Sequence, residues 1–283
     1  MFVREVAKDF LGPRLAGQTI PAFETISVAQ GLSQGMVFDL LQDREGFIWV
    51  ATKNGLNRYD GYSFTVYTND PYDPHSLSSN IVTTLFEDSQ GRIWAGTENA
   101  GVNVFDKRTG KFYRISNRPN DPASLSGNRV YNCISEMQDG RILVPAEDAG
   151  FNVISLSPEF FERDAAPKIR RKTLPGNAQV YGIGRDENGT TWISDLQNRV
   201  YRYDPDNEQM NPLPGSRFVN NAYGLGNGEI WTTAQFFLWD GVRLRPLFDT
   251  KKYKPGNLVL NPTREPWLNF HEEPEFYQFS LYL

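Results

Sequence analysis

Short apolar runs separated by turn residues dominate the chain. One unit begins with the run Met36–Leu41, passes through an acidic turn that ends in glycine, and continues with Ile48–Thr52. Two further runs follow at Leu56–Tyr59 and Ser63–Tyr67. The runs are short, alternate in polarity, and are rich in β-branched and aromatic residues with turn residues between them. This pattern predicts four antiparallel strands per unit and no helix of ordinary length.

The unit recurs along the chain, and one large apolar slot marks each copy. Successive slots lie 36 to 49 residues apart. They are occupied by Trp49, Trp94, Leu143, Trp192, Trp231 and Trp267. Self-similarity at this period, with four strands in each repeat, predicts an all-β fold of the β-propeller type. Six repeats predict six blades, and a seven-bladed ring cut short is the alternative.

Several recurring residues are interpreted as architecture. A tryptophan is wide enough to pack one twisted blade against the next, so we assign no ligand role to those in the slot. Asn57, Asn103 and Asn152 recur in register on the third strand and are also predicted to be structural. Cys133 falls in a first-strand position, where we expect a small buried apolar side chain. As the one cysteine of the chain, it excludes an internal disulfide.

The two ends of the repeat region are complementary. Residues 22–28 have a strand pattern but precede the first complete repeat, and the last repeat, from about Asn257 to Leu283, lacks a fourth strand. An open array of blades would leave two unpaired edges, which invite aggregation. We therefore predict a single propeller domain over residues 22–283, closed by the strand 22–28. Residues 1–21 are predicted to form an N-terminal extension.

Composition narrows the range of partners. The chain has 283 residues and a net charge of −5, which is ordinary for one large all-β domain. It has no basic stripe of the kind that binds nucleic acid, and no apolar run long enough to span a membrane. The N-terminus has no apolar segment typical of a signal peptide. We expect no nucleic-acid partner and no membrane contact from this segment.

The first two repeats resemble a known sensor repeat. The residues that carry the resemblance are Gly31-Leu32-Ser33, Gly46-Phe47-Ile48-Trp49-Val50-Ala51-Thr52 and Gly55-Leu56-Asn57-Arg58-Tyr59-Asp60. They resemble the two-component regulator propeller repeat, and the resemblance is specific over roughly residues 22–155. It implies a periplasmic sensor region of the kind found in Bacteroidetes hybrid histidine kinases. It further implies a ligand-binding module for oligosaccharides, without a signalling output in this chain.

Binding to a propeller usually occupies the face that carries the connections between blades and the tips between second and third strands. Here that face combines amides, carboxylates and a few aromatic rings, which suits a neutral or cationic hydroxylated ligand such as an oligosaccharide. The repeated Asp-Pro and Leu-Ser pairs of the connections are predicted to be structural caps. A second propeller copy is a further possible partner. The candidate ligand-binding residues are Asn54, Arg58, Tyr72, His75, Glu98, Asn99, Arg129, Tyr131, Glu147, Asp148 and Tyr181.

Catalytic chemistry finds little support in the sequence. With two histidines and one cysteine, no metal-ligand cluster is formed, and no nucleophile elbow is present. We therefore predict no catalytic residue, no metal and no cofactor. Two alternatives stay open. The Gly-x-x-Trp phrase is also similar to that of streptogramin lyases, whose chemistry relies on histidine. Because His271 stands beside Glu272 and Glu273, a lyase or hydrolase is one alternative. A protein-interaction scaffold is the other alternative.

Overall fold

The fold was analysed in a computed structural model of the chain. It describes residues 26–131, 134–146, 150–163, 165–185, 189–197 and 199–212, except the side chain of Arg163, and the backbone of seven strands between residues 222 and 278. The described residues are almost entirely strands and turns. The one α-helix among them, α1 (Phe160–Arg163), is a single turn. The predicted all-β class is confirmed.

Four antiparallel sheets of four strands each occupy residues 37–212, and we call them blades 1 to 4. Blade 1 consists of β1 (Val37–Gln42), β2 (Ile48–Thr52), β3 (Gly55–Tyr59) and β4 (Phe64–Tyr67). Blade 2 consists of β5 (Val82–Glu87), β6 (Ile93–Thr97), β7 (Val102–Asp106) and β8 (Lys111–Ile115). Blade 3 consists of β9 (Ser135–Glu136), β10 (Ile142–Pro145), β11 (Phe151–Ser155) and β12 (Lys168–Lys172). Blade 4 consists of β13 (Val180–Arg185), β14 (Thr191–Asp195), β15 (Val200–Asp204) and β16 (Gln209–Pro212).

Two more sheets are described by backbone pairing alone. One consists of β17 (Ala222–Leu225), β18 (Glu229–Thr232), β19 (Phe236–Trp239) and β20 (Leu244–Pro246). The other has three strands, β21 (Pro255–Leu260), β22 (Pro266–Phe270) and β23 (Glu273–Gln278). Within the part of the chain described with its side chains, the blade count is therefore four and not the predicted six.

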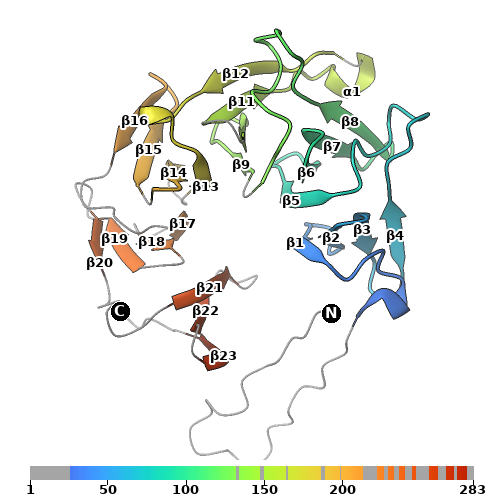
Figure 1. The fold of residues 1–283 in the computed structure, drawn as a ribbon, viewed down its shortest axis with the longest axis horizontal. Helices are drawn as coiled ribbons and strands as arrows, with labels where there is room; N and C mark the ends of the chain where they lie inside the picture. The colour runs from blue at the N-terminus through green and yellow to red at the C-terminus, as the bar shows by residue number, and fades with distance from the viewer. Residues whose placement is uncertain are drawn as a thin grey trace, which may run out of the picture.

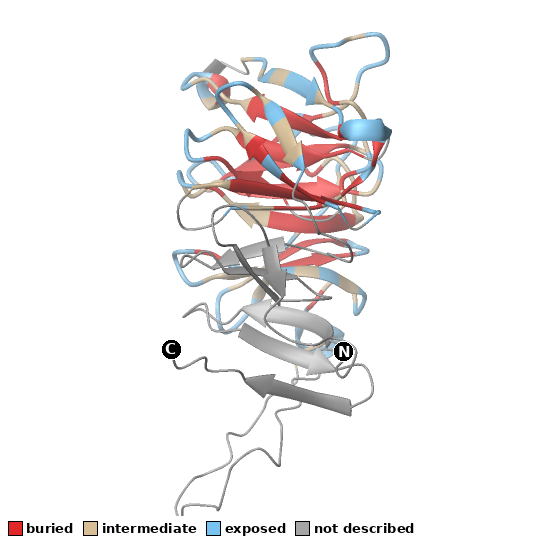
Figure 2. Ribbon diagram, turned by 90° about the vertical axis from the view of Figure 1, so that its left-hand side faces the viewer, coloured by how far each residue is buried: buried red, intermediate tan, exposed pale blue. Residues whose placement is uncertain are grey.

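The blades are arranged around a common centre. Figure 1 shows β1, β5, β9 and β13 on the inner side of the arc, with β4, β8, β12 and β16 on its outer side. Buried residues run through the middle of these blades, and exposed residues lie at the loops (Figure 2). Each of the three apolar clusters joins side chains of two neighbouring blades. The core is therefore a series of contacts between successive blades.

The recurring large apolar slot of the repeat is core, as predicted. Trp49 and Trp94 are 0% exposed and Trp192 is 1% exposed, and Leu143 is also fully buried. Each of Trp49, Trp94 and Leu143 lies in a cluster shared with a neighbouring blade. The side chains of Trp231 and Trp267, like Cys133, lie outside the described residues.

The asparagines of the third strands are structural, as predicted. The side chain of Asn103 accepts a 2.9 Å hydrogen bond from the backbone N–H of Ser78 and donates to the carbonyl of Ala95. Asn57 and Asn152 make the corresponding bonds in blades 1 and 3. A buried amide satisfied on both sides ties the incoming connection to the middle of its blade.

Two predicted strands differ from the structure. Of the closing segment, residues 22–25 lie outside the described residues, and Val28 begins the 3₁₀ helix Val28–Gln30. Ser27 and Gln30 cap that helix reciprocally, which favours a helical turn over a strand at this end. Ring closure by residues 22–28 stays a prediction. The first strand of blade 3, expected at residues 130–134, is Ser135–Glu136, and residues 132–133 lie outside the described residues.

Candidate functional site

The connections between blades and the tips between second and third strands share one face, as expected. The backbone N–H of Gly55, at the tip of blade 1, donates to the carbonyl of Asn80 in the next connection at 2.6 Å. Gly101 and Asn128 repeat this bond at 2.8 Å. The connections themselves are capped structurally, since Ser76 Oγ and Ser124 Oγ bond to the backbone of their own loops. The loops of this face are therefore held firmly by their own hydrogen bonds.

A β-bulge recurs where the inner strands of blades 1, 2 and 4 begin. In β1 the register with β2 shifts between Val37 and Asp39, which leaves Phe38 as the extra residue. The same shift in β5 leaves Thr83, and in β13 it leaves Tyr181. A bulge inserts one unpaired residue and re-aims its side chain, and such positions often lie next to functional sites. We call this position the bulge slot.

Tyr131 precedes β9, the inner strand of blade 3. The side-chain oxygen of Asn128 accepts from the backbone of Asn117, as that of Asn80 accepts from Asn69, so the two connections superimpose in register. Counted from these asparagines, Tyr131 corresponds to Thr83. Blades 3 and 4 therefore both carry a tyrosine close to the entry of the inner strand, and in blade 4 it is the bulge residue.

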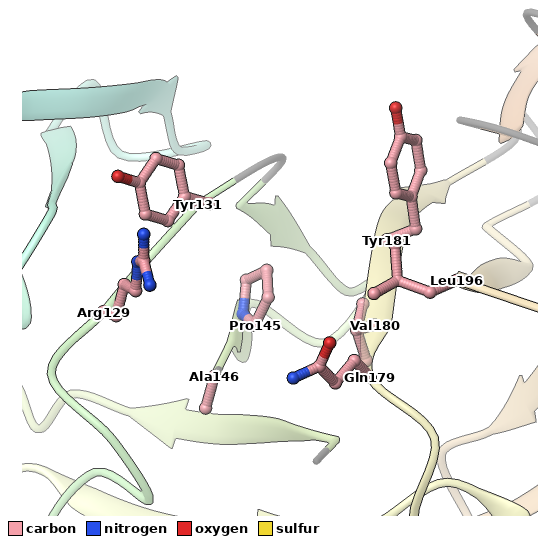
Figure 3. A pocket seen from close by; sticks show the side chains of 8 residues that line it. All are labelled: Arg129, Tyr131, Pro145, Ala146, Gln179, Val180, Tyr181 and Leu196. Carbon is pink, nitrogen blue, oxygen red and sulfur yellow. The ribbon is translucent and has the colours of Figure 1, made fainter. Parts of the chain in front are cut away.

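The two tyrosines line one cavity of about 400 Å³ between blades 3 and 4. Figure 3 shows Tyr131 and Tyr181 on opposite sides of the opening, with Pro145 between them. This volume is at the lower end of the roughly 300–1,000 Å³ that small-molecule sites occupy. The full lining consists of Arg129, Tyr131, Pro145, Ala146, Gln179, Val180, Tyr181 and Leu196.

Tyr131 is fixed by two neighbours. Its hydroxyl donates a 2.8 Å hydrogen bond to Oε1 of Glu98, at the tip of blade 2. The guanidinium carbon of Arg129 lies 4.8 Å from the centre of its ring, which is cation–π distance. One face of the ring is thus covered by Arg129, and the phenol end is held by Glu98. The ring is oriented before any ligand arrives.

The cavity unites three of the predicted ligand residues, Arg129, Tyr131 and Tyr181, with Glu98 behind them. Arg58 lies elsewhere, because its guanidinium packs over the rings of Phe47 and Trp49 at 4.7 and 5.9 Å. Its Nε is buried without a hydrogen-bond partner. Arg58 therefore belongs to the packing of blade 1.

The other candidates are scattered or undescribed. His75 packs edge-on against the ring of Tyr113 on β8, the outermost strand of blade 2, at 5.4 Å. Tyr72 is 95% exposed on the same connection. Asn54 and Asn99 are exposed at the tips of blades 1 and 2. Glu147 and Asp148 lie outside the described residues.

Sequence reasoning missed the apolar and amide part of the cavity. Pro145 and Ala146 replace the Gly96-Thr97 pair of blade 2, and Leu196 replaces the polar Glu98. Gln179 and Val180 lead into the bulge slot of blade 4. The departure of the third repeat from the pattern at Pro145-Ala146 was the available signal, since a repeat loses its regular residues where function reshapes it.

The cavity offers binding groups rather than an evident catalytic set. Its lining combines one cationic side chain, one amide and two phenols with four apolar residues. Among the described residues, no group of three or more histidines, cysteines and carboxylates is placed to hold a metal ion. Displaced pKa values occur in the framework. Burial raises the pKa of Asp39 on β1, and burial together with the bond to Asp195 raises the pKa of Tyr201 to about 12.

These features define a β-propeller with a ligand-sized cavity between blades 3 and 4, on its connection face. Residues 31–54 and 76–99 match the two-component regulator propeller repeat. A segment of 56 residues is 45% identical to histidine kinase P4 of Formosa agariphila. That segment is 20% of this chain but only 4% of the kinase.

Solved structures of similar fold fall into two groups. The first contains extracellular domains of B. thetaiotaomicron proteins assigned as hybrid two-component systems. BT3049 matches with a TM-score of 0.61 and 20% identity, over 89% of this chain and 41% of that one. BT4673 matches with a TM-score of 0.64 and 20% identity, over 84% and 33%. This chain therefore spans less than half of either domain.

The second group contains virginiamycin B lyase from Staphylococcus aureus. It matches with a TM-score of 0.61 and 13% identity, over 88% of this chain and 85% of the lyase. At these identities both groups establish the fold. Among the described residues, no helix has the length and apolar character needed to cross a membrane.

Proposed function

We propose that this chain is a non-catalytic sensor propeller that binds a small hydroxylated ligand, an oligosaccharide, in the cavity between blades 3 and 4. The observation that carries the proposal is the cavity itself. Two tyrosines, one arginine and one amide line a space of about 400 Å³ on the connection face. Sugars present C–H groups to aromatic faces and hydroxyls to amides, guanidinium groups and phenols.

The repeats support a sensor role. Matches to the two-component regulator propeller repeat cover residues 31–54 and 76–99, and the similar Bacteroides structures are extracellular domains. On this proposal the chain senses its ligand outside the cytoplasm, in the periplasm, as part of a two-component system. A histidine kinase as output of the same system is proposed from the similarity to histidine kinase P4.

A thermal-shift screen of the purified chain against polysaccharide-derived oligosaccharides tests the proposal. A ligand that binds only the folded state raises the melting temperature in proportion to its concentration above Kd. We expect one sugar class to give a saturable shift, confirmed by calorimetry, with the sugar recovered unchanged. The absence of any shift across the panel would contradict the proposal. Light scattering of the same purified chain would detect self-association as an increase in mass. Such an increase would indicate a second propeller copy as the partner and favour a scaffold.

A lyase is the second candidate, because virginiamycin B lyase matches this fold over most of both chains. A variant of that lyase with alanine in place of a histidine is catalytically inactive. Of the two histidines here, His75 packs against Tyr113 on the outer strand of blade 2, and His271 lies outside the described residues. Incubation with virginiamycin B, followed by chromatography, tests this candidate. A product peak that the His271→Ala variant fails to make would establish it.

A further inference from the structure

We infer that Tyr131 and Tyr181, which precede and begin the inner strands of blades 3 and 4, make this a two-platform sugar site, in which each stacks one ring of a linear pyranose oligosaccharide. This inference rests on the proposed function and adds the class of ligand and the residues that select it. The ligand is then a chain of at least two rings, and a monosaccharide occupies only half of the site.

The repeat geometry places the two rings. Tyr131 lies before β9 and Tyr181 near the start of β13, the inner strands of consecutive blades. Both line the same cavity, from opposite sides of its opening (Figure 3). A ligand that touches both rings has to extend along the ring of blades, from blade 3 to blade 4. The repeating units of an oligosaccharide match such a repeated platform.

The exposed face of Tyr131 is determined by its neighbours. Arg129 covers one face at 4.8 Å, and the bond to Glu98 fixes the hydroxyl end. What remains for a ligand is the opposite face of the ring, whose negative potential attracts the C–H groups of a pyranose. Glu98 does not line the cavity, so it acts as a positioning residue through Tyr131.

The floor between the platforms is apolar. Pro145, Ala146 and Val180 line the cavity between the two tyrosines, and none of their side chains forms a hydrogen bond. Gln179 and Arg129 supply polar groups at the edge. An apolar floor with a polar rim suits a ligand whose rings turn one C–H face inward and their hydroxyls outward. It disfavours a compact polar ligand that needs bonds on every side.

The other bulge slots provide a matched control. Blade 1 has Phe38 in the slot and blade 2 has Thr83, and neither lines the cavity. Phe38→Ala thus removes an aromatic ring from the same repeat position without touching the proposed site. Tyr62→Ala, at a tyrosine that is 96% exposed, controls for loss of a phenol from the surface.

The test is calorimetric titration of the whole chain with length-matched sugars. The probes are xylose with xylobiose, glucose with cellobiose, galactose with β-1,4-galactobiose, and mannose with β-1,4-mannobiose. In the series that binds, we expect the disaccharide to bind more tightly than its monosaccharide. Tyr181→Ala and Tyr131→Ala should each lower the affinity for the disaccharide by roughly tenfold, which is the effect of losing one aromatic contact. Phe38→Ala and Tyr62→Ala should leave the affinity unchanged.

The role of Glu98 has a separate readout. Glu98→Ala should weaken the disaccharide, and Glu98→Gln, which keeps an acceptor for the Tyr131 hydroxyl, should restore the affinity. Melting curves confirm that each variant is folded. The two-platform site would be overturned if the chain bound the monosaccharide and the disaccharide equally well. It would also be overturned if the tyrosine variants bound as the unchanged chain does. In either case the proposed sugar sensor would still stand. Failure of every sugar to bind the unchanged chain would overturn the proposed function and this inference together.

Discussion

The indole Nε1 of Trp94 donates a 2.7 Å hydrogen bond to Oδ2 of Asp88, and both side chains are fully buried. Trp49 and Asp43 repeat this bond at 2.8 Å in blade 1. The other carboxylate oxygen of Asp88 accepts from the backbone of the turn that leads to the tryptophan. The Asp-x-x-Gly-x-x-Trp phrase is therefore one polar unit inside the core, in which a buried carboxylate is satisfied by its own turn, by the indole and by one cation, Arg92 for Asp88 and Lys107 for Asp43.

Removal of the Asp88 carboxylate should lower the free energy of unfolding, because the indole N–H of Trp94 loses its acceptor. Asp88→Ala leaves the buried N–H of Trp94 and the turn amides without an acceptor. We expect unfolding in urea to show a loss of about 1–3 kcal/mol, the cost of a buried unsatisfied group. An unchanged free energy of unfolding would show that water replaces the carboxylate.

Blade 3 has two apolar residues in place of the hydrogen-bonded aspartate and tryptophan. Met137 and Leu143 occupy the two positions and lie in one apolar cluster. The double change Asp88→Met and Trp94→Leu should therefore cost less than the sum of the two single changes, by at least about 0.5 kcal/mol, because it removes both polar partners. Strict additivity in a double-mutant cycle would contradict this coupling.

Arg171 on β12 is expected to stabilise the connection before its blade. Its guanidinium donates to the carbonyls of Asp121, Ser124 and Leu125 at 2.7 to 3.0 Å. Lysine lacks this fork of donors, so Arg171→Lys should cost about 1 kcal/mol and speed hydrogen exchange in residues 121–125. The adjacent Arg170→Lys, which alters only a surface ion pair with Glu208, is the control and should cost little. Equal losses of stability from the two changes would contradict the role of Arg171 in holding the connection.

The interface between blades 1 and 2 should respond to acid. Burial alone would raise the pKa of Asp43, but the bonds from Lys107 and Trp49 outweigh it and lower that pKa from its ordinary 3.8. A lowered pKa contributes stability above pH 3.8 that is lost as the pH falls through the folded value. Urea unfolding at a series of pH values should therefore show a decline below this point that is smaller in Asp43→Asn. Parallel pH profiles for the two proteins would refute the assignment.

Gly101 is expected to be required for two separate reasons. It has a φ of +77°, and an added Cβ would lie 2.2 Å from the carbonyl oxygen of Ile115. Gly110 has a similar φ of +70°, but an added Cβ would meet nothing within 4 Å. Gly110→Ala should cost about 1–2 kcal/mol from backbone strain, and Gly101→Ala clearly more. Equal losses in chemical denaturation would show that the close approach is relieved cheaply.

Much of the framework was predictable from local sequence. The strands of blades 1 and 2, the buried slot, the third-strand asparagines and the connection face all follow from patterns within one repeat. They could be predicted because alternation, turn residues and a recurring tryptophan act over a few residues or over one period. The end of the predicted closing segment was wrong, since Ser27 and Gln30 cap a short helix there.

The sequence by itself determined a propeller of repeated four-stranded units with a core tryptophan in most of them. Only the tertiary structure decided which candidates meet. Tyr131 and Tyr181 converge on one cavity because a bulge re-aims Tyr181 at the start of β13 and the neighbouring blade supplies the opposite wall with Tyr131. Arg58 turns instead onto Phe47 and Trp49. Register shifts and contacts between blades depend on segments about 50 residues apart, so the pattern within one repeat does not encode them.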